Sequence, residues 1–224
     1  RHVFDSLGEE FMRGPHTIIF AESANIIFKD FKIDRAANYA FMGYALENAE
    51  FSGLYITQGW DGIHIRGGKN IEIHDCTFET GDDALAGGYW DNMHIHHNNI
   101  NSSCNGLRMI MPSENLLVEN CSFTGPGVYP HRTSGNFNSL FGMILEPGAW
   151  GIAKGECNNI LLENITMHGV SSPVSVSVRD GTEAHDLTIR NITATGLTGT
   201  MSQVVSWNDN GFDSISVTNY SISR

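Results

Sequence analysis

The sequence predicts an all-β fold, a right-handed parallel β-helix built from coils of about 22 residues. Three observations support this prediction: an asparagine that recurs at a nearly constant interval, apolar residues that alternate after it, and a composition that disfavours helices. The chain has 224 residues, among which are 24 glycines and only four lysines. Glycine and asparagine are poor helix formers, whereas the frequent Ile-x-Ile and Val-x-Val alternations suit strands.

The repeat is anchored on an asparagine that is followed by apolar residues one, three, six and eight positions later. The anchors are Asn25, Asn48, Asn70, Asn92, Asn115 and Asn159, with looser copies at Asp186 and Ser214. Subtracting the numbers of neighbouring anchors gives 23, 22, 22, 23, 44, 27 and 28. Each unit forms two short strands, and the bend between them falls on residue types that tolerate left-handed backbone. The predicted bends are Asp30, Gly53, Asp75, Asn120, Asn164, Asn191 and Asn219.

One such unit cannot bury its apolar face alone, but stacked units form a continuous core with asparagines laddered along the corners. The main alternative is a β-sandwich, which requires a hairpin turn about every ten residues and would not preserve one anchor over so many units. A single domain over residues 1–224 is therefore expected. The longest interval, between Asn115 and Asn159, holds one coil with two insertions, residues 125–140 and 147–157, which we expect to wall a binding face.

Composition and charge exclude several classes of protein. Hydrophobic residues make up 41% of the chain and charged residues 17%, which excludes a disordered chain. The 13 basic residues against 25 acidic ones give a net charge of −12, which opposes binding to nucleic acid or to an anionic membrane. No run of eighteen apolar residues is present to span a membrane, and residues 1–5 lack the apolar core of a signal peptide. We expect a monomer that is secreted or periplasmic.

Acidic side chains gather on the third strand of successive coils. Asn38, Asp61, Asp83 and Asn105 stand thirteen residues after the first four anchors, and alternating apolar residues follow them. Strands on consecutive coils lie about 4.8 Å apart, so Asp61, Asp83 and Asn105 are expected to form one column, with Asp82 beside it. Three carboxylates would then crowd one patch.

The same alternation predicts the floor of a cleft beside this column. The apolar positions expected to point inward are 63, 65, 85, 107, 109, 143 and 145. The positions between or beside them, expected to point outward, are His64, Arg66, Ala86, Gly88, Arg108, Ile110, Ile144 and Glu146. Aromatic rings near the column suit sugar stacking or ordinary loop packing, and they belong to Trp60, Tyr89, Trp90 and Trp150. The substrate-binding candidates are His64, Arg66, Asn105, Arg108, Glu146, Trp60, Tyr89 and Trp90.

Three crowded carboxylates indicate acid–base chemistry. Mutual repulsion raises the pKa of at least one of Asp61, Asp82 and Asp83, which places a protonated acid next to ionised bases at neutral pH. Glycoside hydrolysis needs an acid for the leaving oxygen and a base for water, about 6.5 to 9.5 Å apart when configuration inverts. The alternative is that Asp61 and Asp83 merely cap turns, but three repelling charges in adjacent coils have no structural purpose.

The stretch from Gly14-Pro15 to Asn115 resembles the core of glycoside hydrolase family 28, the polygalacturonases and their relatives. The matching motifs are Asp61-Gly62 at the end of a tripeptide and Thr80-Gly81-Asp82-Asp83 one coil later. The resemblance implies a fold of the pectate-lyase-like superfamily, and it implies that Asp82 is the general acid while Asp61 and Asp83 activate the water for inversion. From this resemblance we expect the chain to lack the family's N-terminal cap and opening coil.

The substrate-binding motifs depart from the family. The family's Asn-Thr before the first Asp is Gly59-Trp60, and its Gly-His-Gly is Cys104-Asn105-Gly106. Its Lys falls at Gly88 and its Arg-x-Lys at Ile144 and Glu146, so the cations that hold uronates are replaced. Polygalacturonate is therefore not expected to be the best substrate, although His64, Arg66 and Arg108 are candidates to replace the lost cations. The chain equally resembles β-helical hydrolases of neutral glucans, which place three Asp in this arrangement.

Two other functions remain open. In a calcium-dependent polysaccharide lyase, the Asp cluster would bind the cation and Arg108 would remove a proton next to the uronate carboxyl. In a glycan-binding β-helix without activity, Asn105 would stand in place of the catalytic-site histidine of the family.

No metal or cofactor is expected from the sequence. His94, His96 and His97 resemble a metal-binding box, but no acidic or cysteine partner has ligand spacing. The four cysteines, at 76, 104, 121 and 157, also lack such spacing and are expected to be core or loop thiols. His131 and His168 lie in or after the insertions, from which they could reach the cleft.

Overall fold

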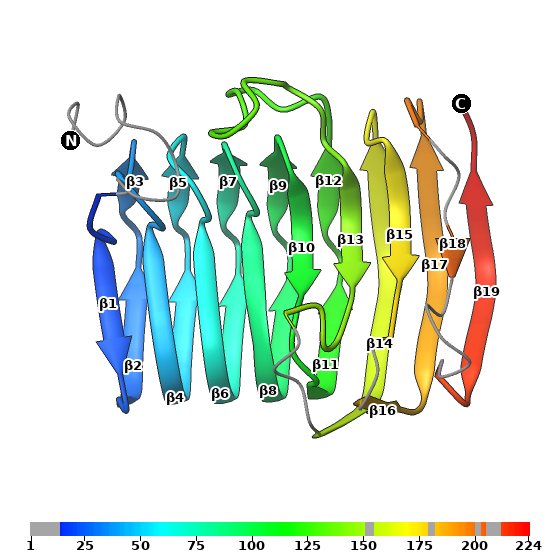
Figure 1. Ribbon diagram of the computed structural model, residues 1–224, viewed down its shortest axis with the longest axis horizontal. Coiled ribbons are helices and arrows are strands. Elements are labelled where there is room, and N and C mark those ends of the chain that lie inside the picture. Colours follow the sequence, from blue (N-terminus) through cyan, green and yellow to red (C-terminus); the bar gives the residue numbers. More distant parts are fainter. Residues whose placement is uncertain (1–13, 151–154, 179–181, 200–202, 205–211) are drawn as a thin grey trace.

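The computed structural model describes residues 14–150, 155–178, 182–199, 203–204 and 212–224. These residues form strands that stack side by side along one axis, and none of them is helical (Figure 1). The strands are β1 (Ile18–Ala21), β2 (Ala24–Lys29), β3 (Lys32–Asp34), β4 (Phe41–Ser52), β5 (Tyr55–Thr57), β6 (Ile63–His74), β7 (Thr77–Thr80), β8 (Leu85–His96), β9 (Asn99–Ser102), β10 (Asn105–Met109), β11 (Glu114–Glu119), β12 (Ser122–Thr124), β13 (Phe141–Leu145), β14 (Gly155–His168), β15 (Ser172–Val176), β16 (Thr182–Ala184), β17 (Leu187–Thr195), β18 (Gln203–Val204) and β19 (Ile215–Ile222).

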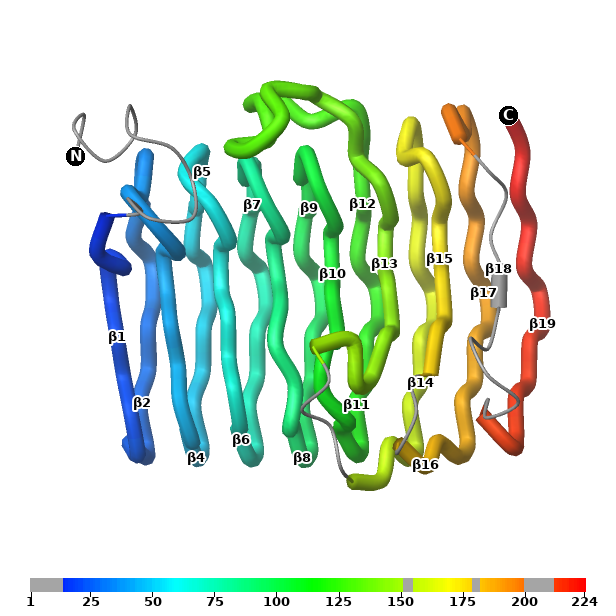
Figure 2. Tube along the Cα trace, in the orientation of Figure 1, coloured from blue at the N-terminus to red at the C-terminus, as the bar shows by residue number. Residues whose placement is uncertain are grey.

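The strands form three parallel faces, and each coil of the chain contributes to all three (Figure 2). The first face is the series β1, β4, β6, β8, β10, β13, β15 and β18. The second runs through β2, β4, β6, β8, β11, β14, β17 and β19, and the third begins with β3, β5, β7, β9 and β12. Long strands such as β6 and β8 turn a corner and so belong to two faces. This arrangement confirms the predicted right-handed parallel β-helix.

The corners lie where the repeat predicts them. The anchors Asn25 to Asp186 have φ between 52° and 60°, and the seven predicted bends have φ between 49° and 61°. Asparagine amides ladder along the anchor corner: Asn48 donates to Asn25 at 3.2 Å and Asn70 to Asn48 at 2.9 Å. The ladder is broken between Asn92 and Asn115, because the amide of Asn115 donates to Asp91 at 3.1 Å instead of to the preceding anchor.

The core fills the interior of the coil with the inward residues of all three faces. Phe51, Phe78 and Phe123 are each 1% exposed, and the predicted inward positions of the third strand are also buried. No cysteine of the described part forms a disulfide; Cys104 is half-buried and the other three are buried, as predicted for core or loop thiols. Within the described ranges no helix is long and apolar enough to cross a membrane.

The first insertion, residues 125–140, arches from β12 back over the ends of β7 and β9 (Figures 1 and 2). Its start is tied to the third face, because the Asn101 amide donates to the Pro126 carbonyl at 2.9 Å and accepts from the Val128 N–H at 2.7 Å. Its middle lies on the turn after β7, where the Arg132 N–H donates to the Gly81 carbonyl at 3.0 Å. The second insertion, residues 147–157, is described only in part, since residues 151–154 lie outside the described ranges.

The register agrees with the predicted column of Asp61, Asp83 and Asn105, but it corrects the thirteen-residue spacing rule for Asn38 on the coil before it. Phe41 pairs with Ile63, so the residue beside Asp61 is Tyr39 and not Asn38. The cause is an unequal interval: the residue numbers differ by 23 between the anchors Asn25 and Asn48, but by 22 between Phe41 and Ile63 on the first face. Equal spacing from the anchor therefore misplaces the first coil by one residue.

Candidate active site

Three carboxylates come together where the chain turns from the third face into the first. Asp61 precedes β6, and Asp82 and Asp83 precede β8 on the next coil. The Gly62 N–H donates to the Asp83 carbonyl at 2.9 Å, which fixes the two turns in register. One carboxylate oxygen from each of the three residues lies within 4.8 Å of the others. The predicted crowding is therefore present, but the carboxylates lie closer together than the separation of about 6.5 to 9.5 Å expected for an inverting pair.

Asp83 is the most deeply buried of the three, with 3% of its surface exposed. It accepts hydrogen bonds from the Asn105 side-chain amide at 2.6 Å and from the Asn105 N–H at 3.2 Å, so Asn105 contacts the carboxylate as the column predicts. Burial, reinforced by the Asp82 charge, raises the pKa of Asp83 to about 6, against the opposing effects of Arg108 and Asn105. A pKa near 6 lets Asp83 exchange a proton under ordinary conditions.

Asp82 is the more accessible carboxylate, with 17% of its side chain exposed. The hydroxyls of Thr80 and Ser102 both donate to its backbone carbonyl at 2.7 Å, and its carboxylate Oδ1 accepts from the Asp83 N–H at 3.0 Å. The His131 Nε2 atom of the first insertion lies 3.7 Å from Asp82 Oδ1. An accessible carboxylate on a rigid turn is well placed to meet a substrate.

Asp61 is held by a chain of side chains. His64 Nδ1 lies 2.7 Å from Asp61 Oδ2, and Arg66 Nε donates to His64 Nε2 at 3.3 Å. Because Nε2 accepts, the proton of the neutral imidazole resides on Nδ1, which then donates to Asp61. Burial and the neighbouring Arg66 charge lower the pKa of His64 to about 3, so this ring stays neutral. His64 therefore fixes the orientation of Asp61 and cannot serve as the replacement cation that the sequence suggested.

Aromatic rings enclose His64. Tyr39 stacks on the imidazole with ring centroids 4.9 Å apart, and Trp150 approaches it with centroids 6.0 Å apart. The Arg66 guanidinium also lies over the Trp150 ring, with Cζ 4.8 Å from the ring centroid. His64 is consequently only 1% exposed. The expected open floor is corrected here: Ala86, Gly88, Ile110 and Glu146 point away from the core but are buried as well.

Arg108 lies near Asp83, as predicted from the register. Its Nη1 is 3.7 Å from Asp83 Oδ2, and its Nε donates to Glu146 Oε1 at 2.6 Å. Burial lowers the pKa of Arg108, but the two carboxylates outweigh this effect and raise it. Glu146 is 7% exposed and neutralised by Arg108, so it positions the guanidinium, in contrast to the substrate-facing role expected from the sequence.

Arg108→Ala is expected to lower kcat/KM at least tenfold, about 1.4 kcal/mol, because the guanidinium is the cation nearest Asp83. Removing it also leaves the carboxylates of Asp83 and Glu146 without their shared partner, so the free energy of unfolding should fall by about 1 to 3 kcal/mol. Urea unfolding and steady-state kinetics measure both effects. The double variant Arg108→Ala/Glu146→Ala should recover stability but not kcat/KM, and wild-type kinetics in Arg108→Ala would place the residue outside the site.

The four aromatic candidates lie in four different surroundings. Trp90 is 3% exposed and donates through Nε1 to the Ile65 carbonyl at 2.9 Å, so it is a core residue and its predicted sugar-binding role is wrong. Trp60 is 5% exposed beneath Arg132, whose guanidinium lies 5.9 Å from the ring. Tyr89 is 41% exposed, but it occupies the corner of β8, six residues beyond Asp83. Trp150, 40% exposed, is the aromatic residue that lies over the site.

Three residues at the site were missed or left undecided by the sequence. Tyr39 was hidden by the misplaced register of the first coil, and His131 and Arg132 belong to an insertion that no repeat positions. His131 could have been anticipated, because binding and catalytic residues are often found on long loops. His168 does not join the carboxylates; its Nδ1 lies 3.0 Å from the Thr195 hydroxyl on the third face.

Fold and site define the class of the protein: a parallel β-helix with a carboxylate cluster where two neighbouring coils turn. Residues 16–142, more than half of the chain, match the family described as the right handed beta helix region, and the chain belongs to this family. Polygalacturonase QRT2 of Arabidopsis thaliana is 22% identical over 170 residues, which cover 73% of this chain and 37% of that protein.

Two solved structures have the same fold. The family 28 exopolygalacturonase of Yersinia enterocolitica has a TM-score of 0.64 at 14% identity, covering 82% of this chain and 34% of its own. The polygalacturonase of Erwinia carotovora ssp. carotovora has a TM-score of 0.57 at 10% identity, covering 83% and 58%. The chain thus spans between about a third and three fifths of these relatives, and its polygalacturonase-like β-helix fold, expected from the motifs, is confirmed.

Proposed function

We propose that this chain is a glycoside hydrolase that cleaves a polysaccharide or oligosaccharide, with Asp61, Asp82 and Asp83 as its catalytic residues. The observation that carries the proposal is the cluster itself: three carboxylates from two coils with oxygens within 4.8 Å of one another. The pKa of Asp83, raised to about 6, lets this carboxyl change its protonation state near neutral pH, and His64 holds Asp61 in one orientation. The likeness to polygalacturonases agrees with this chemistry.

In the proposed reaction, the accessible Asp82 donates a proton to the glycosidic oxygen as the bond from the anomeric carbon to that oxygen breaks. A water molecule attacks the anomeric carbon and gives its proton to Asp83 or Asp61, which are ionised at this stage. His64 keeps the Asp61 carboxylate aimed at the site, and Arg108 stabilises negative charge on Asp83. The two products are shorter saccharides, and one of them carries a new reducing end.

Inversion of configuration is proposed from the resemblance of the Asp82-Asp83 motif and not from the spacing, which is shorter than is usual for an inverting pair. Proton NMR of the first-formed anomer tests it directly. A product with the opposite anomeric configuration to the substrate is expected, whereas a product of unchanged configuration would assign a nucleophilic role to one of the carboxylates.

The charges around Arg108 argue against the lyase alternative. Arg108 would have to lose a proton to act as a base, but the carboxylates of Asp83 and Glu146 raise the pKa of its guanidinium. A panel of polysaccharides, assayed in parallel for new reducing ends and for ultraviolet absorbance, separates the functions. Reducing ends without absorbance support hydrolysis, absorbance supports a lyase, and binding without turnover supports a glycan-binding module.

We predict that polygalacturonate is a poorer substrate than neutral or mixed glycans. Near the site, the described part of the chain places four carboxylates, those of the three catalytic candidates and of Glu146, against three guanidinium groups. Two of these, Arg66 and Arg132, lie over tryptophan rings, and Arg108 is shared between two carboxylates. With one of the carboxyls protonated as the acid, these charges balance, so no surplus of positive charge is left to hold an anionic polymer. The test compares kcat/KM on polygalacturonate with kcat/KM on neutral or mixed glycans, and a clear preference for polygalacturonate would overturn the prediction.

A further inference from the structure

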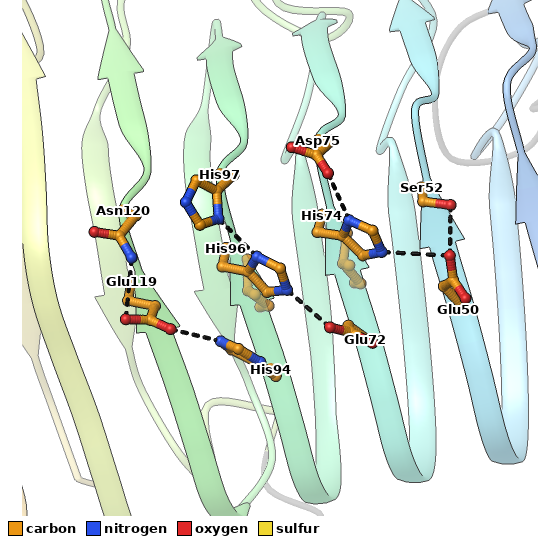
Figure 3. A network of polar contacts seen from close by, with 12 residues as sticks. Glu50, Ser52, Glu72, His74, Asp75, His94, His96, His97, Glu119 and Asn120 are labelled. Carbon is orange, nitrogen blue, oxygen red and sulfur yellow. Dashed lines mark hydrogen bonds and ion pairs between the residues drawn. The ribbon is translucent and has the colours of Figure 1, made fainter.

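Two rows of polar side chains run across the second face, far along the coil from the carboxylate cluster. The first row contains Glu50, Glu72 and His94 on neighbouring strands, and the second contains His74, His96 and Glu119. Diagonal contacts link the rows, as Figure 3 shows: His74 Nε2 to Glu50 at 3.3 Å, His96 Nε2 to Glu72 at 2.9 Å, and His94 Nε2 to Glu119 at 2.9 Å. None of these residues takes part in the proposed hydrolysis.

Within these rows, Glu72, His94 and His96 form a compact donor set. His94 and His96 alternate on β8 and therefore share the outward face, with ring centroids 4.1 Å apart. Glu72 lies directly beside His94 in the register of β6 and β8. One ligand atom from each of the three residues lies within 4.8 Å of the others. The acidic partner that the local sequence did not offer to the histidines thus comes from the preceding coil.

We propose that Glu72, His94 and His96 bind a divalent transition-metal ion of the kind that prefers imidazole ligands, such as Zn²⁺. Two imidazoles and one carboxylate are a frequent zinc donor set, and an open fourth position is left for water. Ligand atoms around tetrahedral zinc lie about 3.3 Å apart, for bonds of about 2.0 Å. His96 Nε2 and Glu72 Oε1 are already 2.9 Å apart, and no pair of ligand atoms has to close by more than about 1.5 Å, which rotation of side chains on a solvent-facing sheet allows.

Access and charge favour a cation at this place. The side chains of His94 and Glu72 are 36% and 48% exposed, so an ion can enter from solvent without opening the fold. The nearest lysine or arginine side chains in these rows are Lys29 and Arg190, which continue the second row at its two ends. The strands between them place only carboxylates, histidines and uncharged residues in these rows, so no cation has to be displaced. A bound ion would join β6 to β8 across the coil boundary.

The test is calorimetric titration of ZnCl₂ into the chelator-treated chain, with MgCl₂ as the comparison ion. One saturable equivalent of zinc is expected and none of magnesium, because magnesium prefers oxygen ligands. His94→Ala and His96→Ala should each weaken zinc binding at least tenfold, and Glu72→Gln should weaken it measurably. Saturating zinc should also raise the Tm of the wild-type chain and leave that of His94→Ala unchanged.

Two matched variants control for zinc bound elsewhere on the chain. His185→Ala removes an exposed histidine that pairs with Asp213 on other coils, and zinc binding should persist in it. Asp82→Asn disables the carboxylate cluster, a second place where a cation could be held, and zinc binding should persist there too. The absence of saturable zinc binding, or equal binding by wild type and His94→Ala, would overturn the proposal, as would loss of binding in Asp82→Asn. Circular dichroism of each variant confirms that the β-helix is retained.

Discussion

Asp82→Asn is expected to fold like the wild type and to lose hydrolytic activity by a factor on the order of 10² to 10⁴, the usual effect of removing a general acid. An amide cannot protonate the leaving oxygen, so the bond to the leaving sugar must break without assistance. Folding should be spared because the turn is held through the backbone carbonyl of Asp82, to which Thr80 and Ser102 donate. Reducing-end assays on the best substrate of the panel and thermal unfolding measure the two quantities.

The matched control for this variant is Asp30→Asn. Asp30 is an exposed bend residue with φ of 57°, a conformation that asparagine adopts readily, and it lies on the first coil. Activity and Tm should both remain at the wild-type level in Asp30→Asn. If Asp82→Asn retained more than half of the wild-type activity, the assignment of Asp82 as the acid would be wrong.

The fold was predictable because its determinants are local and repeated. Every coil needs left-handed residues at its corners, and asparagine, aspartate and glycine at Asn70, Asp75 or Gly53 reveal those corners in the sequence. Apolar alternation then assigns the inward residues of the third strand. The column of Asp61 and Asp83 followed from the same period, since residues one coil apart become neighbours.

What could not be predicted depends on contacts that the period does not encode. Trp90 looked like a sugar platform because it stands close to the carboxylate column in the sequence, but the corner at Tyr89, which has φ of 55°, breaks the alternation and turns the Trp90 ring into the core. The insertion that carries His131 has no repeat, so its return over the site is a matter of tertiary packing. Glu146 was expected to face the substrate. It forms a buried ion pair with Arg108 on the adjacent coil instead, and this pairing neutralises its charge.

The buried Asp83 is expected to make the stability of the chain depend on pH. Its pKa is raised from the ordinary value of 3.8 to about 6, first by burial and then by the Asp82 charge. The folded state therefore holds a proton that the unfolded chain releases between these two values. The stability contributed by that proton is fully present below pH 4 and is lost as pH rises through 6. The titration of Asp83 should therefore lower the free energy of unfolding by roughly 3 kcal/mol at pH 8 relative to pH 4.

Asp83→Asn should remove this dependence, because the amide carries no charge at any pH. The difference in free energy of unfolding between Asp83→Asn and wild type, measured with urea, should increase in favour of the variant from pH 4 to pH 8. Asp82→Asn provides the matched comparison: without the Asp82 charge the pKa of Asp83 is less raised, so the dependence should shrink but not vanish. The other groups near Asp83, namely Asp61, Arg108, Asn105 and Cys104, remain in place in both variants.

The same titration should appear in the kinetics of the wild type. If Asp83 accepts the proton of the attacking water, it must be ionised, so kcat/KM should fall as pH decreases below about 6. Arg108→Ala removes the cation that favours the ionised form and should move this acidic limb to higher pH. If kcat/KM instead decreases as pH rises above about 6, Asp83 acts as the acid. A stability difference between Asp83→Asn and wild type that is independent of pH would show that Asp83 does not hold its proton in the folded chain.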